Sequence, residues 1–247
     1  MYLWFCPLIA FLLGSIPFGL ILAKAKGIDI RQHGSGNIGA TNVLRVIGKK
    51  YGLCCLLLDA LKGFIPVVIV LNLIQIEGKK IGLFHIAGLD SWAILLPAAS
   101  QFKGQLIHVI TALAAVLGHN YSPWVDFKGG KGIATSAGAL LALMPAGVAL
   151  LAAVWLLVFL FSRYVSLASV IAAAMLPLIT HCGARFHHLN NDPLQASLWQ
   201  SGTWNKPLFF FSLVLASLAI WKHRPNIQRL CQGTEHRFAR KSKSTDV

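Results

Sequence analysis

Three polar segments of the chain combine glycines with side chains that can bind an anion. Residues 33–42 read HGSGNIGATN, residues 119–138 read HNYSPWVDFKGGKGIATSAG, and residues 223–235 read HRPNIQRLCQGTE. Glycines let a backbone turn tightly and bring its N–H groups close to a ligand, while lysine and arginine supply positive charge. This combination is typical of sites that bind phosphate groups.

The second polar segment, residues 119–138, contains the sequence KGGKG, which is similar to a phosphate-binding loop. Its glycines would offer N–H donors, and its lysines charge, at the start of a helix that begins near Ile133. The P-loop signature GxxxxGK[ST] is absent from the chain, so a P-loop NTPase is not predicted. The residues of this segment predicted to bind substrate are Lys128, Gly129, Gly130, Lys131, Gly132 and Thr135.

The first polar segment, residues 33–42, alternates glycines with short side chains that can donate and accept hydrogen bonds, and an arginine follows it. A flexible loop ahead of a helix is the alternative, but so many small hydrogen-bonding residues argue for binding. The predicted site residues here are Ser35, Gly36, Asn37, Thr41, Asn42 and Arg45.

The third polar segment, residues 223–235, follows the last apolar run of the chain. A basic anchor at the membrane surface would explain Arg224 and Arg229. It would not explain His223, Asn226 or Glu235, which are therefore predicted to belong to the site.

Composition indicates what must position these segments. Hydrophobic residues make up 56% of the chain and charged residues 12%, which is typical of a membrane protein. The net charge of +14 is spread over loops and a tail without a basic, aromatic-rich stripe, so nucleic acid is not a predicted partner. The five cysteines show no CxxC pair, which argues against a disulfide framework or a zinc site, and no metal or cofactor is predicted.

The apolar runs predict an all-α, polytopic integral membrane protein. Residues 1–23 carry no charged side chain and are predicted to remain as the first span. Lysines and arginines follow it directly, which places that loop in the cytoplasm and the N-terminus outside. The connections at 77–104 and 182–206 are then expected on the external side. The predicted spans are residues 1–23, 52–76, 104–119, two short helices within 132–162, 165–181 and 207–221.

The run from 132 to 162 decides the number of spans. It carries no Asp, Glu, Lys or Arg, and as one helix its 31 residues would be about 46 Å long, which exceeds the hydrocarbon core. Met144-Pro-Ala-Gly147 lies near its middle, where proline and glycine favour a break. Folding back here also leaves the basic tail after Lys222 in the cytoplasm. We therefore predict seven membrane helices, two of them short.

Two charged residues lie inside the second predicted span. Asp59 and Lys62 are three residues apart and so share one helical face. They are predicted to pair near the cytoplasmic end, and a role at the floor of the site is the alternative.

The three segments together resemble a known family. GSGNIGATN followed by Arg45, GHNYSPWVDFKGGKGIAT and HRPNIQRLCQGTE are similar to the cytoplasmic motifs of the bacterial acyl-phosphate:glycerol-3-phosphate acyltransferases of the PlsY type. Residues 14–19, GSIPFG, and 163–166, RYVS, also stand where that family has similar residues. The departures are the long connections at 77–104 and 182–206, the extended tail, and Cys231 in place of an aliphatic residue.

The resemblance implies transfer of a fatty acyl group from acyl phosphate to the 1-hydroxyl of sn-glycerol 3-phosphate, giving lysophosphatidic acid and phosphate. It implies that Arg45 and Lys131 grip glycerol 3-phosphate and that the glycine loop at 129–132 holds the acyl-phosphate head. His223 is a possible general base, but the resemblance favours proton transfer to the donor's own phosphate. The residues predicted to be catalytic are Ser35, Arg45, Lys131, His223 and Asn226; Ser166 and Glu235 join the predicted substrate-binding residues.

The same reading predicts a single membrane acyltransferase domain over residues 1–235 and a basic, disordered cytoplasmic tail over 236–247. It places the protein in the bacterial inner membrane with its site facing the cytoplasm. The expected partners are glycerol 3-phosphate, long-chain acyl phosphate, membrane lipid and the enzyme that makes acyl phosphate.

Two other interpretations compete with this one. A transporter of an anion or phospholipid could use the same glycine-rich segments, but it predicts polar residues near mid-membrane in several spans. Another acyltransferase superfamily uses the motif HxxxxD, which this chain matches at His85…Asp90 and His187…Asp192. Both matches fall in predicted external loops, so neither is predicted to be catalytic.

Overall fold

The structure is a computed structural model that describes residues 4–78, 84–191 and 206–238. Within these ranges it is mostly helical and holds two three-residue strands. The helices are α1 (Phe5–Ser15), α2 (Phe18–Lys24), α3 (Ala40–Val46), α4 (Lys49–Leu73), α5 (Gln101–Asn120), α6 (Ile133–Leu143), α7 (Pro145–Ser162), α8 (Val165–Asn191), α9 (Lys206–Lys222) and α10 (Arg224–Cys231).

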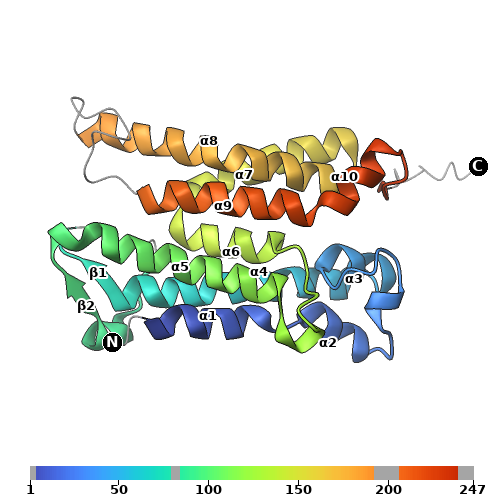
Figure 1. The fold of residues 1–247 in the computed structure, drawn as a ribbon, viewed down its shortest axis with the longest axis horizontal. Coiled ribbons are helices and arrows are strands. Elements are labelled where there is room, and N and C mark those ends of the chain that lie inside the picture. The colour runs from blue at the N-terminus through green and yellow to red at the C-terminus, as the bar shows by residue number, and fades with distance from the viewer. Residues whose placement is uncertain (1–3, 79–83, 192–205, 239–247) are drawn as a thin grey trace, which may run out of the picture.

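The long helices lie nearly parallel to one another in two layers, with α1 to α6 in one and α7 to α10 in the other (Figure 1). The N-terminal residues of α1 lie at one end of the molecule, whereas α3, α10 and the turn between α5 and α6 lie at the other (Figure 1). The three polar segments therefore meet at one end of the bundle. We call this the α10 end.

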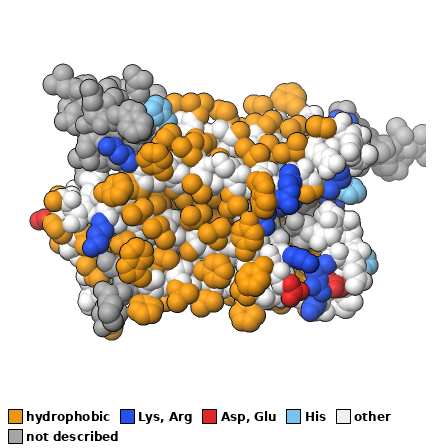
Figure 2. All heavy atoms as spheres, in the orientation of Figure 1, with side chains coloured by type: hydrophobic (Ala, Val, Ile, Leu, Met, Phe, Trp, Pro, Cys, Tyr) orange, Lys and Arg blue, Asp and Glu red, His pale blue; other side chains and the backbone are white. Residues whose placement is uncertain are grey.

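In the part of the chain that the structure describes, five helical stretches are long and apolar enough to cross a membrane, and a shorter apolar helix covers Ile133–Leu143. On the face shown in Figure 2, hydrophobic side chains cover the middle of the molecule and charged side chains lie toward its two ends. The prediction of an α-helical, polytopic membrane protein is confirmed. The number of seven spans and the sidedness of the termini stay predictions.

The predicted break in the run 132–162 is present. Helix α6 ends at Leu143, Met144 has φ −150° and ψ 68°, and α7 begins at Pro145. The two helices run in opposite directions (Figure 1). Proline at the first position of α7 needs no N–H partner, which makes it a favourable residue to start the second helix. A similar break divides α1 from α2 at Ile16 and Pro17.

Both long connections contain secondary structure that the sequence did not predict. Within 77–104, β2 (Ile94–Leu96) pairs in parallel with β1 (Ile74–Ile76). After the predicted span at 165–181, α8 continues as a helix to Asn191. Strands of three residues and helix extensions give no periodic signal long enough to predict.

Glycines allow the central helices to pack closely. A Cβ atom on Gly63 of α4 would meet the Thr135 carbonyl of α6, and one on Gly138 of α6 would meet the Ala60 carbonyl of α4. The backbones of α4 and α6 are therefore in contact, as small residues permit in membrane helices. This contact sets the position of α6, which starts at the polar loop 129–132.

Candidate active site

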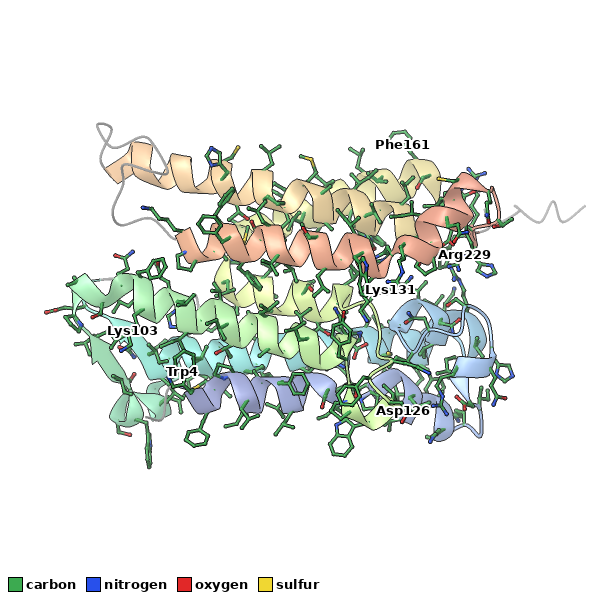
Figure 3. All side chains as sticks on the ribbon, in the orientation of Figure 1. Trp4, Lys103, Asp126, Lys131, Phe161 and Arg229 are labelled. Carbon is green, nitrogen blue, oxygen red and sulfur yellow. The ribbon has the colours of Figure 1, made fainter. Side chains whose placement is uncertain are left out.

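A cavity of about 520 Å³ lies near the α10 end, between the two layers of helices. Many of its polar side chains come from α3, α10 and the loops beside them, and others come from α4, α5, α6 and α8, while its apolar wall comes from α6, α7, α8 and α9. Lys131 projects at this end, toward the layer that carries Arg229 (Figure 3). One cavity thus joins charged groups to a surface that suits a hydrocarbon chain. The apolar wall includes Leu140, Val148, Leu151, Trp155, Leu176 and Leu215.

A hydrogen-bonded chain crosses the polar part of the cavity. The Lys131 ammonium donates to the Asn226 Oδ1 atom at 2.5 Å, and Asn226 Nδ2 donates to Glu235 Oε1 at 2.7 Å. Ser166 Oγ also donates to Glu235 Oε1, at 2.8 Å, and Arg229 Nε donates to Oε2 at 2.7 Å. Glu235 therefore ties α8, α10 and, through Asn226, the loop that carries Lys131.

Charge and burial set the pKa values in this chain of contacts. Burial lowers the pKa of Lys131 to about 8, although the nearby Glu235 carboxylate opposes the shift. Burial alone would raise the pKa of Glu235, but the hydrogen bonds from Asn226, Ser166 and Arg229 outweigh it and lower the pKa. At neutral pH the site therefore contains an ammonium group beside an ionised carboxylate.

His223 is buried at the junction of α9 and α10. Its Nδ1 atom lies 2.8 Å from the Ala219 carbonyl oxygen, which can only accept, so Nδ1 carries the proton and Nε2 is left as an acceptor. Burial, followed by the charge of Lys131, lowers the pKa of His223 to about 4. The ring is therefore neutral at physiological pH and can accept a hydrogen bond from a hydroxyl group.

Arg45 lies on the opposite wall, in the last turn of α3. Its guanidinium lies 5.3 Å from the centre of the Phe238 ring, and a long 3.5 Å contact reaches the His236 carbonyl oxygen. Neither contact neutralises the charge. The guanidinium thus remains available for an anion in the cavity.

Asn42 was predicted to bind substrate, but its side chain holds the first polar segment in shape. Its amide nitrogen donates to the carbonyl oxygens of Asn37 and His33 at 2.9 and 3.0 Å, and its oxygen accepts from the Ser35 N–H at 2.9 Å. The carbonyl of Asn37's own side chain accepts from the Gly39 N–H at 2.8 Å. The amide of Asn42 is consequently used inside the protein, although its side chain still borders the cavity.

The glycine loop differs from its prediction as well. The Gly130 N–H donates to the His119 carbonyl oxygen at 3.1 Å, so it is not free to bind a phosphate. Cβ atoms on Gly129 and Gly130 would meet the His119 backbone oxygen and the His119 ring. These two glycines are required by close packing on His119. Gly132, with φ +79°, adopts the left-handed conformation before α6.

Most of the predicted site residues come together at the cavity. Five do not border it: Lys128 is exposed, Thr135 is buried against α4, Gly36 and Gly129 face other backbone, and Gly130 faces the His119 ring. The predicted residues that line the cavity are Ser35, Asn37, Thr41, Asn42, Arg45, Lys131, Gly132, Ser166, His223, Asn226 and Glu235; those that do not are Gly36, Lys128, Gly129, Gly130 and Thr135.

Four polar residues at the cavity were not predicted to bind substrate. Asp59 and His119 come from α4 and α5, and Ser136 and Ser169 from α6 and α8. The pairing predicted for Asp59 is present, because Lys62 Nζ lies 2.8 Å from Asp59 Oδ1. The alternative that this pair contributes to the floor of the site is compatible with the position of Asp59.

The HxxxxD motifs lie elsewhere. His85 and Asp90 contact each other at 2.9 Å in an exposed position near the strands, and neither borders the cavity. The second match involves Asp192, which lies outside the described residues. Within the described ranges no group of three metal-binding side chains is present, and all five cysteines are free.

Known proteins resemble this chain over most of its length. The family model "Glycerol-3-phosphate acyltransferase" matches residues 4–233. The glycerol-3-phosphate acyltransferase of Aquifex aeolicus is 40% identical over 234 residues, covering 95% of this chain and 98% of that protein. The corresponding protein of Geotalea daltonii is 39% identical over 231 residues, covering 94% and 95%.

Two solved structures are also similar, and both are of PlsY (YgiH), an integral membrane glycerol 3-phosphate acyltransferase. The glycerol 3-phosphate form superposes with a TM-score of 0.71 at 37% identity, covering 97% of this chain and 96% of that one. The lysophosphatidic acid form gives a TM-score of 0.69 with the same identity and coverage. The chain belongs to the glycerol-3-phosphate acyltransferase family.

Proposed function

We propose that the protein transfers a fatty acyl group from acyl phosphate to the 1-hydroxyl of sn-glycerol 3-phosphate. The products are lysophosphatidic acid and inorganic phosphate. The observation that carries this proposal is the composition of a single cavity, in which Arg45, Lys131 and the neutral ring of His223 adjoin an apolar wall. The similarity of this chain to glycerol-3-phosphate acyltransferases supports glycerol 3-phosphate as the acceptor.

The acceptor would occupy the polar part of the cavity. Arg45 and Lys131 stand on different elements that border the same space, so they can hold a phosphate dianion from two sides. Ser35 and the second N–H of Asn226 Nδ2 would donate hydrogen bonds to its oxygens, and Ser166, whose O–H donates to Glu235, would accept one from its hydroxyl group. The Lys131 contact with Asn226 keeps the ammonium group in place before substrate arrives.

The donor would lie with its acyl chain along the apolar wall and its phosphate near the start of α6. Ile133 and Ala134 border the cavity in the first turn of this eleven-residue helix, and no side chain caps it. Free N–H groups of a first turn favour negative charge. They would stabilise the carbonyl oxygen and the leaving phosphate as charge develops on them.

The chemical step requires no covalent enzyme intermediate, because the donor is an activated mixed anhydride. The 1-hydroxyl oxygen attacks the carbonyl carbon, an ester C–O bond forms, and the bond from that carbon to the phosphate oxygen breaks. The hydroxyl proton passes to the departing phosphate. Nε2 of His223 would accept a hydrogen bond from the hydroxyl and orient it. Holding the two substrates in reactive geometry would then supply most of the rate enhancement.

We also propose the finer placement of the protein. The site would face the cytoplasm of a bacterial inner membrane, since lysines and arginines favour that side. Residues 1–235 would form the acyltransferase domain, and 236–247 a basic tail. An enzyme that makes acyl phosphate would supply the donor, because a reactive anhydride with a long chain is best delivered at the membrane.

The test is a turnover assay with purified protein. Palmitoyl phosphate with glycerol 3-phosphate should release phosphate and form lysophosphatidic acid, whereas acyl-CoA or acyl carrier protein should support no turnover. Lys131→Ala and His223→Ala should each lose activity at an unchanged expression level, and Lys128→Ala should retain it because Lys128 is exposed outside the cavity. Turnover with an acyl thioester but not with acyl phosphate would contradict the proposal.

A further inference from the structure

A buried set of charged and polar side chains lies directly behind the glycine loop. Asp59 and Lys62 of α4 form an ion pair at 2.8 Å, with side chains that are 3% and 4% exposed. His119, at the end of α5, places Nδ1 3.6 Å from the same Asp59 oxygen. Lys62 also donates to the Ile16 carbonyl oxygen at 2.7 Å, at the break between α1 and α2. The proposed reaction uses none of these groups.

The His119 ring stands between Asp59 and the glycine loop. One edge of the ring, at Nδ1, faces the carboxylate. The other edge, at Nε2 and Cε1, lies where a side chain on Gly130 would be. The His119 backbone supports the same loop, through the hydrogen bond from the Gly130 N–H and the close approach of Gly129. Gly129 and Gly130 therefore both pack on His119, and Lys131 follows them directly.

We propose that His119 and Asp59 are positioning residues that hold the loop 129–132 and so set the place of the Lys131 ammonium group in the cavity. This inference rests on the proposed function, in which Lys131 binds the acceptor phosphate. Asp59 fixes the orientation of the His119 ring, and the Lys62 ammonium balances the charge of the buried carboxylate. The ring in turn holds the loop in place. A shift of about 1 Å in a binding group can cost about a hundredfold in rate.

The geometry distinguishes the roles of the two glycines. A methyl group at position 130 would meet the His119 side chain, so shortening that side chain should make room for it. A methyl group at position 129 would meet the His119 backbone oxygen, which no side-chain change moves. The variant Gly129→Ala is therefore a matched control for Gly130→Ala.

The experiment measures kcat and the KM for glycerol 3-phosphate in Gly130→Ala, His119→Asn and the double variant, using the acyl-phosphate assay. Each single variant should raise KM about tenfold or more, as expected for a displaced charged contact. The double variant should recover at least fivefold relative to Gly130→Ala. His119→Asn should give no recovery when combined with Gly129→Ala. In His119→Gln the longer side chain carries its amide toward Gly130, so the rise in KM should be smaller than in His119→Asn. This variant replaces His119→Asn in the experiment if His119→Asn fails to fold.

A second control separates positioning from stability. His108 is also buried on α5, its Nε2 donates to the Ile74 carbonyl oxygen at 2.9 Å, and it does not border the cavity. His108→Gln should lower the unfolding temperature and leave KM unchanged. If His119 variants likewise lose stability without a change in KM, or if the effects of positions 119 and 130 simply multiply, the inference is wrong while the proposed function stands. An inactive wild-type protein would overturn both.

Discussion

At the scale of single residues, the site combines a cation of lowered pKa with a histidine that stays neutral. Lys131 and His223 lie in the same cavity, and the Lys131 ammonium group helps to keep the His223 ring in its neutral form. The ring can then accept a hydrogen bond over the whole physiological range. The pH dependence of the reaction should therefore come from the lysine.

The first prediction concerns this lysine. The pKa of Lys131 is lowered to about 8, so the free protein loses the cation as pH rises through that value. Since kcat/KM reports ionisations of the free enzyme, kcat/KM for glycerol 3-phosphate should fall above pH 8. In Lys131→Arg the guanidinium stays charged, so kcat/KM should be lower but level between pH 7.5 and 9.5. A wild-type profile that is level through pH 9.5 would contradict this assignment.

The second prediction concerns Glu235, which accepts from three donors. In Glu235→Gln one carboxylate oxygen becomes a donor and meets Asn226 or Arg229 donor groups unfavourably. Loss of a charged hydrogen bond costs about 1.5–3 kcal/mol, so activity should fall at least tenfold. Asp126→Asn is the control, because Asp126 is exposed and its left-handed φ of 52° suits asparagine. The steady-state rates of Glu235→Gln and Asp126→Asn test this prediction, and equal rates for the two variants would contradict it.

At the scale of elements, the position of α6 determines where the polar loop meets the cavity. This helix packs on α4 through Gly138 and through Gly63 of α4, and each of these glycines faces the backbone of the other helix. Because α6 is only eleven residues long, a change in this contact moves its first turn as well.

The third prediction tests the packing of α6. Gly138→Ala should destabilise the protein by about 1–3 kcal/mol, because its methyl group would meet the Ala60 carbonyl. It should also lower activity through the displaced start of α6. Gly88→Ala meets nothing within 4 Å and should change neither property. Thermal unfolding in detergent, measured beside turnover, separates the two variants. Equal unfolding temperatures would show that α6 can shift freely.

The sequence predicts some elements much better than others. Charge-free runs of about 20 residues leave few alternatives to membrane helices, and Pro145 marks the break between α6 and α7. The helices α3 and α10 were not predicted, because seven or eight residues form a helix only when tertiary packing supports them. The strands β1 and β2 are shorter still.

The site shows the same limit. The three polar segments could be found from their residue types, and most of their side chains reach the cavity. The part played by His119 could not, because the contact of its ring with Asp59 and Gly130 depends on how α4 and α5 pack. Glycine is also ambiguous in a sequence. The same residue that frees an N–H for a ligand permits close backbone packing, as at Gly129 and Gly130.

At the scale of the whole molecule, the site is assembled from both layers of helices. Ser35, Arg45 and Lys131 belong to the first layer, and Ser166 and His223 to the second. Exposed tryptophans lie toward both ends of the bundle, as is typical of residues at membrane surfaces.

The fourth prediction concerns sidedness. Cys231 is exposed on α10, and Lys103 is exposed near the start of α5, toward the opposite end (Figure 3). In intact cells a membrane-impermeant maleimide should label a protein with cysteine introduced at position 103 and no other cysteine. It should label a protein with Cys231 alone only after the membrane is opened. The reverse pattern would place the α10 end outside the cell and contradict a cytoplasmic site.

The apolar wall along α6 to α9 has a kinetic consequence. Binding of glycerol 3-phosphate, which is water-soluble, depends on its molar concentration. Binding of a donor whose chain lies on this wall depends instead on the mole fraction of the donor in the membrane lipid. Adding inert lipid at a constant total amount of donor should therefore slow turnover, although the bulk molarity is unchanged. For a donor bound as proposed, saturation of this half of the site would be set by the two-dimensional composition of the bilayer.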